Sequence, residues 1–171
     1  MTLIRHILSF AAAAAVTSAS AAAFAAEPWA MPGEEAIEPY AASDANAGAT
    51  PFAGEAMFQA FHGREGVERI VADMLDRAFA DPRISDIFKG HDRVRLQRVL
   101  SEQFVYLLGG PGGYSGRDMA SAHKDMGVEP ADMNLLVEHL QLAMDKEGVP
   151  FQTQNRFLAK LAPMKRDIVG K

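Results

Sequence analysis

From about Gly54 to the end of the chain, apolar residues recur at steps of three and four rather than two. That spacing places their side chains on one face of a helix, whereas a half-buried strand would alternate. The first such stretch contains Val67, Ile70, Val71, Met74, Leu75 and Phe79. No useful length of the sequence alternates with period two, and neither a repeat nor a coiled-coil heptad recurs. The sequence therefore predicts an all-α domain.

Proline and glycine divide this domain into separate helices. Residues 109–113, Gly-Gly-Pro-Gly-Gly, are rich enough in helix breakers to form a true loop. Asp92 is placed to cap a helix, and Glu129-Pro130 to begin one. The expected helices are one ending at Asp81, a short one closed by Gly90, one running from Asp92 to Leu108, a short one from Arg117 to Met126, one from Pro130 to Glu147, and a last one from Phe151 to Val169.

The composition excludes several classes of function. At 171 residues, with 49% hydrophobic and 23% charged residues, the chain suits one soluble domain plus extra segments. Without Cys it has no disulfides, thiolate metal ligands or cysteine nucleophile. A net charge of -5 argues against a nucleic-acid partner. No phosphate loop, G-x-S-x-G or H-E-x-x-H motif occurs, so no catalytic residue is predicted.

The first 25 residues have the three-part layout of a secretory signal peptide. A positive start at Arg5 and His6 precedes the apolar run 7–16, and Ala23-Phe24-Ala25 offers a cleavage site. The alternative is an uncleaved anchor, but the strongly apolar run is short for a membrane span. We therefore expect a periplasmic or secreted protein with no stable membrane insertion after cleavage.

Residues 26–53 are expected to form an acidic linker rich in Pro and Ala. They contain four prolines and five acids but no Lys or Arg, and little apolar periodicity to offset ordering entropy. The chain from Phe52 onward then holds 17 acids and 16 bases, so the domain at 54–171 is nearly neutral. A solvated tether, whose deletion would leave stability unchanged, is the main expectation; a partner-binding segment is the alternative.

His123 has a setting that the other histidines of the domain lack. Met119 lies four residues earlier, on the same helix face, and Tyr114 and Val128 flank the expected helix. A single imidazole in an apolar, aromatic-rich shell is what a haem iron needs on one side. Taken alone, the same pattern also describes a histidine packed in a core. Of the others, His139 is expected inside the domain, His62 at a helix corner, and His91 exposed before a helix start.

The order of residues around His123 resembles group I of the truncated haemoglobin family, and the resemblance runs from about Phe52 to Lys171. His62 stands where that family usually has Gly. The matching motifs are Leu108-Gly109-Gly110-Pro111, Tyr114-Ser115-Gly116, Met119, Ala122-His123 and Gly127-Val128, together with Phe61-His62-Gly63-Arg64-Glu65-Gly66, Ile87-Phe88-Lys89-Gly90, Val137-Glu138-His139-Leu140 and Gly148-Val149-Pro150.

The resemblance implies a truncated globin-like 2-over-2 helical sandwich around haem b, with His123 as the proximal ligand of the iron. It also implies diatomic ligands, namely O2, NO or CO. The other haem-contacting residues are then expected to be Met119, Tyr114, Phe88, Leu75, Leu96, Leu100, Phe104 and Val128, and the candidate cations for the haem propionates are Arg95, Arg98, Arg117 and Lys124.

The expected distal side departs from the family pattern. Group I members often place a Tyr and Gln residues where this chain has Leu75, Leu96 and Leu100. Bound dioxygen would then lack a hydrogen bond worth about 1.5–3 kcal/mol. NO and CO would lose the least affinity from the absence of this hydrogen bond. A register slip of one residue would instead bring Gln97 inward.

Three functions are consistent with these features. The first is a globin that binds diatomic gases, with NO or peroxide redox chemistry at an apolar pocket and an unidentified electron donor; binding is favoured over dedicated catalysis. The second is a periplasmic electron-transfer or haem-custody protein, which a sixth ligand such as His91 would favour. The third is an all-α interaction domain without haem.

Overall fold

A computed structural model describes residues 29–171 of the protein. The predicted signal peptide, 1–25, lies outside these residues. The described part is helical and contains no strand. Within it, no helix is both long enough and apolar enough to cross a bilayer.

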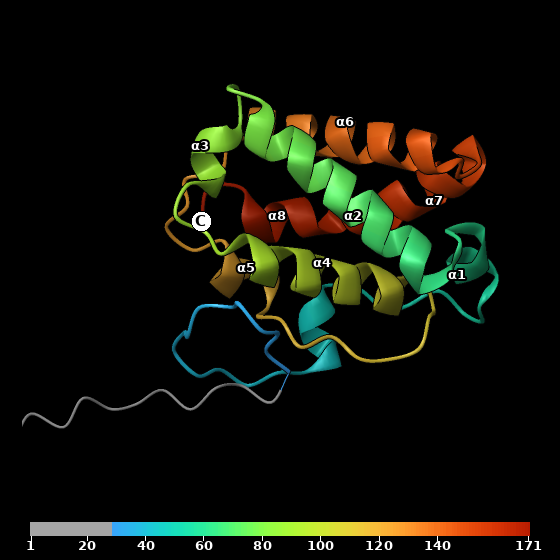
Figure 1. The fold of residues 1–171 in the computed structure, drawn as a ribbon, viewed down its shortest axis with the longest axis horizontal. Coiled ribbons are helices and arrows are strands. Elements are labelled where there is room, and N and C mark those ends of the chain that lie inside the picture. Colours follow the sequence, from blue (N-terminus) through green and yellow to red (C-terminus); the bar gives the residue numbers. More distant parts are fainter. Residues whose placement is uncertain (1–28) are drawn as a thin grey trace, which may run out of the picture.

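Two layers of helices make up the domain (Figure 1). In that view α2 and α4 lie in front of α6, α7 and α8, and the helix α2 packs most extensively against α6 and α4. This arrangement is the 2-over-2 sandwich that the resemblance implied. The elements are η1 (Asp44–Ala47), α1 (Ala56–Ala60), α2 (Gly63–Ala80), α3 (Ser85–Phe88), α4 (Arg93–Leu107), α5 (Met119–Ala122), α6 (Pro130–Glu147), α7 (Phe151–Leu161), η2 (Ala162–Met164) and α8 (Lys165–Ile168).

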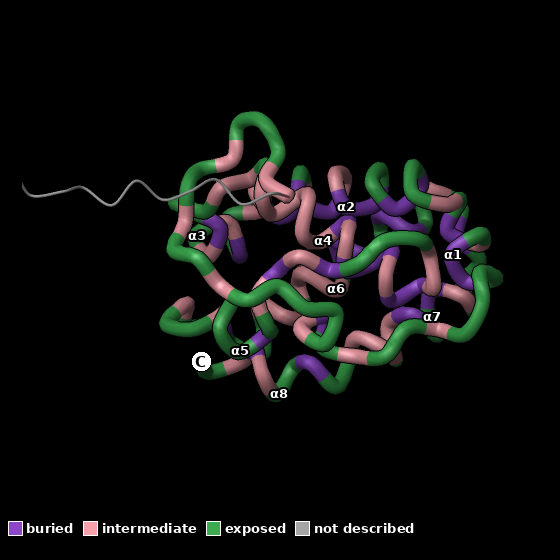
Figure 2. Tube along the Cα trace, turned by 90° about the horizontal axis from the view of Figure 1, so that it is seen from below, coloured by how far each residue is buried: buried purple, intermediate pink, exposed green. Residues whose placement is uncertain are grey.

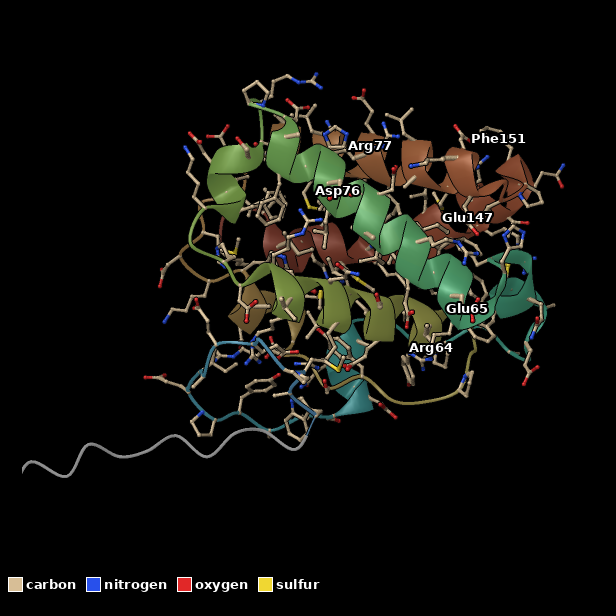
Figure 3. All side chains as sticks on the ribbon, viewed as in Figure 1. Arg64, Glu65, Asp76, Arg77, Glu147 and Phe151 are labelled. Atoms are coloured by element: carbon tan, nitrogen blue, oxygen red, sulfur yellow. The ribbon has the colours of Figure 1, made fainter. Side chains whose placement is uncertain are left out.

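The apolar face predicted for α2 is the face that enters the core. The buried positions of this helix recur at the expected steps, and Figure 2 shows buried segments where the helices face one another. Its outer face is charged, with Arg64 and Glu65 near the start and Asp76 and Arg77 near the end (Figure 3). The core residues of α2 are Val67, Ile70, Val71, Met74, Leu75 and Ala78. Phe79, predicted inward, is half-buried and packs on Phe88, with ring centroids 5.3 Å apart.

Two of the predicted helices are shorter than expected. The stretch from Phe151 to Val169 is interrupted at η2, because Pro163 has no N–H to continue the α-helical pattern. The stretch from Arg117 to Met126 shrinks to the four residues of α5. Asp125 has a φ of 62°, which is left-handed, so the helix cannot extend through it.

The expectation of a solvated tether is wrong for the described residues of the linker. The Glu34 side chain is fully buried against Arg98, whose own side chain is 8% exposed. Ala47 is also fully buried, and Gln103 Nε2 donates a 2.9 Å hydrogen bond to its carbonyl oxygen. We refer to residues 29–53 as the arm. Its acidic composition suggests solvation, but Glu34 has a cationic partner on α4, so the arm packs on the domain.

Candidate functional site

His123 lies where the short helix α5 ends. Asp118 caps that helix by accepting a 3.0 Å hydrogen bond from the Ser121 N–H. The His123 N–H closes it on the Met119 carbonyl oxygen at 3.2 Å, and the backbone then leaves the helical region. The histidine is therefore held at the junction between a capped turn and the loop that leads to α6.

The imidazole of His123 has a defined tautomer. Nδ1 lies 2.8 Å from the Met119 carbonyl oxygen, and because a carbonyl can only accept, Nδ1 must carry the proton. The Nε2 lone pair is then available to a metal. Burial lowers the pKa of His123, a charge on His91 lowers it further, and the bond to Met119 opposes the shift. The ring is thus held in the neutral form that binds metals.

A cavity of about 50 Å³ adjoins the imidazole. Its wall is almost entirely apolar and comes from α3, from the loop after α5, and from α6 and α8. Such a lining excludes water and suits a flat hydrophobic group. The lining residues are Ile84, Ile87, Phe88, His123, Met126, Val128, Asp132, Met133, Leu136 and Ile168.

A second, more polar crevice of about 340 Å³ lies on the α4 side of α5. The two hollows share Met126, and Ala122 of the crevice directly precedes His123 of the cavity. They are therefore adjacent parts of one region around the end of α5. The crevice is lined by Ile37, Tyr40, His91, Asp92, Arg95, Leu96, Val99, Tyr114, Gly116, Arg117, Ser121, Ala122, Lys124 and Met126.

The Tyr114-Ser115-Gly116 motif is explained by packing. The Tyr114 hydroxyl donates a 3.0 Å hydrogen bond to the Arg117 carbonyl oxygen, and its ring lies over the backbone of Gly116. A Cβ at Gly116 would come within 2.1 Å of the Tyr114 oxygen. The pair makes the compact turn that leads into α5 and so helps to place His123.

The predicted haem-contacting residues fall into three groups. His123, Phe88 and Val128 line the cavity, while Leu96 and Tyr114 line the crevice. The others lie against the helical core. Leu75 and Phe104 are buried, and the ring of Phe104 packs edge-on against Phe157 with centroids 5.0 Å apart. Met119 is 8% exposed beside Gln103, and Leu100 is half-buried.

The predicted cations are also divided. Arg117 and Lys124 line the crevice, as does Arg95, which donates a 2.8 Å hydrogen bond to the Glu35 carbonyl oxygen. Arg98 faces away from the crevice and is bound by Glu34, Glu102 and Ser115. The register slip is not observed, because Gln97 lines a separate groove beside Trp29.

The remaining histidines lie where they were expected. His139 is buried on α6, with its Nε2 3.1 Å from Asp81 Oδ2. His62 forms the corner between α1 and α2 in a left-handed conformation with a φ of 60°. His91 is exposed and lies on the crevice.

The prediction missed the arm residues of the site. Ile37 and Tyr40 line the crevice although they precede the domain in sequence. The available signal was the presence of Trp29 and Tyr40, two aromatic residues in a stretch otherwise typical of a solvated tether. Met126, Met133, Leu136 and Ile168 were missed for another reason: three different parts of the chain bring them to His123.

Comparison with known proteins agrees with this geometry. Residues 56–169 match the bacterial-like globin family. A protein named group 1 truncated hemoglobin GlbN, from Mycolicibacterium paratuberculosis, is 33% identical over 106 residues, which cover 62% of this chain and 78% of that protein. A group 1 truncated hemoglobin of Tetrahymena pyriformis is 24% identical over 117 residues, covering 68% of this chain and 97% of that protein.

The solved structure of the Tetrahymena pyriformis truncated hemoglobin in its Fe(III) form superposes with a TM-score of 0.65 at 24% identity, covering 67% of this chain and 98% of that one. The fold and the setting of His123 thus define a small globin of the two-layer kind. The chain belongs to the bacterial-like globin family, among the group 1 truncated haemoglobins.

Proposed function

We propose that this protein binds haem b through His123 and binds O2, NO or CO at the opposite face of the iron. The observation that supports the proposal most strongly is the His123 imidazole, whose Nδ1–H is bonded to Met119 and whose Nε2 is left for a metal beside an apolar cavity. Haem supplies an iron that a single imidazole can hold while its other side remains open to a diatomic ligand.

The residues present fit that group. Phe88 and Val128 offer apolar contacts to a macrocycle on the cavity side, and Leu96 does so on the α4 side. Arg117 and Lys124 lie on the polar crevice, where they can meet carboxylates. These residues support the proposal, because they supply an imidazole, apolar contacts and cations to a haem with its propionates.

The distal side is apolar in this proposal. Leu75, Leu96 and Leu100 offer no hydrogen-bond donor to a bound ligand, so O2 leaves quickly while NO and CO are less affected. NO or peroxide redox chemistry at this pocket, supplied with electrons by an unidentified donor, is the finer form of the proposal.

Reconstitution with haem tests the proposal. Purified apoprotein is titrated with haemin, reduced, and exposed to CO while the visible spectrum is recorded. A stoichiometric Soret band that shifts on CO binding is the expected result. Absence of a Soret band would leave the haem-free interaction domain as the explanation for the fold.

A second candidate function is electron transfer or haem custody, and the position of His91 favours it. His91 lies on the crevice that contains Leu96. If His91 binds the iron as a sixth ligand, the ferrous protein shows a six-coordinate spectrum without added ligand, and His91→Ala converts it to five-coordinate. Identical spectra of the two proteins would rule out this role.

We also propose that the protein is exported to the periplasm or secreted. The support is the charged start, apolar run and Ala23-Phe24-Ala25 of the sequence. N-terminal sequencing of the protein recovered from the periplasmic fraction should begin close to Ala26. Recovery of an intact N-terminus from the cytosol would contradict the proposal.

A further inference from the structure

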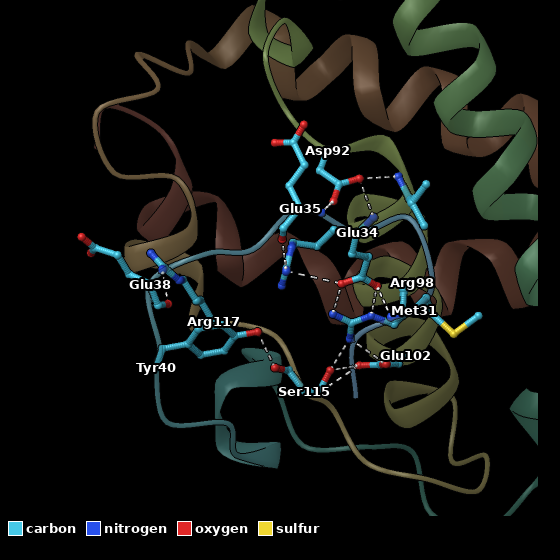
Figure 4. Close-up of polar contacts among 12 residues, drawn as sticks. Met31, Glu34, Glu35, Glu38, Tyr40, Asp92, Arg98, Glu102, Ser115 and Arg117 are labelled. Carbon is cyan, nitrogen blue, oxygen red and sulfur yellow. Dashed lines mark hydrogen bonds and ion pairs between the residues drawn. The ribbon is translucent and has the colours of Figure 1, made fainter. Parts of the chain in front are cut away.

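The arm is fixed to α4 by a buried ion pair. Both Glu34 carboxylate oxygens accept from the Arg98 guanidinium, one of them at 3.0 Å from Nη2, and Arg95 Nη2 lies 3.5 Å from the same carboxylate (Figure 4). The next residue, Glu35, donates its backbone N–H to Asp92 at 2.8 Å. These contacts hold one end of the arm on the first turns of α4.

The arm is fixed a second time, to the loop that precedes α5. The Tyr40 hydroxyl donates to the Ser115 carbonyl oxygen at 2.7 Å, and Asn46 Nδ2 donates to the Gly116 carbonyl oxygen at 3.1 Å. The Tyr114 N–H in turn donates to Asp44 at 2.8 Å. The arm therefore bridges α4 and the turn that places His123.

Between these two attachments the arm faces the crevice. Ile37 and Tyr40 line it together with Leu96 and Lys124. Residues 56–169 match the globin family, so this wall comes from a segment outside the matched region.

Arg117 connects the arm to this crevice. Its guanidinium carbon lies 5.1 Å from the centre of the Tyr40 ring, and Nη2 donates to the Glu38 carbonyl oxygen at 3.1 Å. Nε is buried and has no hydrogen-bond partner among the described residues. Two contacts with the arm thus hold the Arg117 guanidinium in place at the crevice.

We propose that residues 34–47 form an additional wall of the haem site, in which Ile37 and Tyr40 cover the edge of the haem and the arm positions Arg117 to bind a propionate. The inference rests on the proposed haem binding and extends it to a segment that the globin domain itself does not include. Its consequence is slow haem loss, because haem can leave through this side only after the arm moves.

Haem transfer to excess apomyoglobin measures this directly. The mature chain, residues 26–171, is compared with the double variant Ile37→Ala/Tyr40→Ala, and with Glu38→Gln as a control that changes the charge of the arm but not its wall. We expect the double variant to lose haem at least about tenfold faster and the control to match the wild type. Equal rates for wild type and double variant would overturn the inference while leaving haem binding intact. No Soret band in the wild type would instead refute the proposed function.

The role of Arg117 has its own test. One hydrogen bond between charged groups corresponds to roughly tenfold or more in an equilibrium constant. The wild type should therefore bind haem at least about tenfold more tightly than haem dimethyl ester, whose propionates are blocked, and Arg117→Gln should lose most of that preference. An unchanged preference in Arg117→Gln would refute the positioning role.

Hydrogen exchange on the wild type avoids any dependence on how the variants fold. Amides of residues 34–47 should gain protection when haem is added to the apoprotein, whereas amides on the outer face of α2 should not. No change in the arm on haem loading would overturn the inference.

Discussion

Replacing Glu34 by Gln should destabilise the whole domain, although this residue precedes every long helix. The wild-type carboxylate is fully buried and makes two bonds to Arg98. Gln keeps the shape but offers one neutral acceptor. Arg98 keeps its hydrogen bonds to Glu102 and Ser115. The loss of stability should therefore be smaller than the roughly 3–5 kcal/mol typical of a broken buried ion pair. We expect about 2–3 kcal/mol, since a hydrogen bond to a charged group contributes about 1.5–3 kcal/mol.

Thermal and urea unfolding of the apoprotein at pH 7, followed by far-UV circular dichroism, measure this loss. About 2–3 kcal/mol corresponds to a fall in Tm of roughly 8–12 °C for a domain of this size. Glu35→Gln is the matched control, because it removes the same charge from an exposed neighbour and should change stability by less than about 0.5 kcal/mol. A Glu34→Gln variant as stable as that control would show that the arm is a solvated tether.

The effect should also depend on pH with a defined sign. The hydrogen bond to Arg98 lowers the pKa of Glu34 below its usual value of about 4.5. The ionised carboxylate therefore contributes full stability above that value, and the contribution disappears as the pH falls through the lower folded-state pKa. The difference between wild type and Glu34→Gln should be constant from pH 5 to pH 8 and shrink below about pH 4.5.

Three further predictions concern the distal side and the helix packing. Leu75→Tyr adds a phenol donor and should slow O2 dissociation by about tenfold or more in stopped flow, whereas Leu75→Phe should not. Equal dissociation rates for Leu75→Tyr and the wild type would refute the assignment of Leu75 to the distal side. Gly66→Ala should lower the free energy of unfolding, measured in urea, by about 1–3 kcal/mol, because its Cβ would lie 2.1 Å from the Phe61 carbonyl oxygen; an unchanged free energy would contradict this. His139→Ala should destabilise the domain by about 2 kcal/mol, because it removes packing and the contact with Asp81. The haem spectrum should stay unchanged, and an altered spectrum would mean that His139 touches the haem.

The helical fold was predictable because its signals are local. The apolar steps of α2, the Asp92 cap of α4 and the glycine after Glu147 are read directly from neighbouring residues. The short helix α5 was overestimated because the backbone leaves the helical region at His123 and is left-handed at Asp125, and the sequence pattern does not distinguish these residues from helical ones.

The arm could not be predicted in the same way. Its composition suggests solvation, but Glu34 finds its partner 64 residues further along the chain, on a helix face that is formed only in the fold. The site shows the same contrast. His123 was identified by its motif, while Met126 and Ile168 meet at the cavity through packing between distant elements.

The central claim is that His123 holds the haem iron, and His123→Gly tests it most directly. The cavity left by the ring can accept free imidazole, which restores the ligand without the backbone link. We expect haem-reconstituted His123→Gly to lose the iron–imidazole signature in the resonance Raman spectrum, to keep its far-UV helical signal, and to regain the signature when imidazole is added. A variant that keeps normal iron–imidazole ligation without added imidazole would contradict the account.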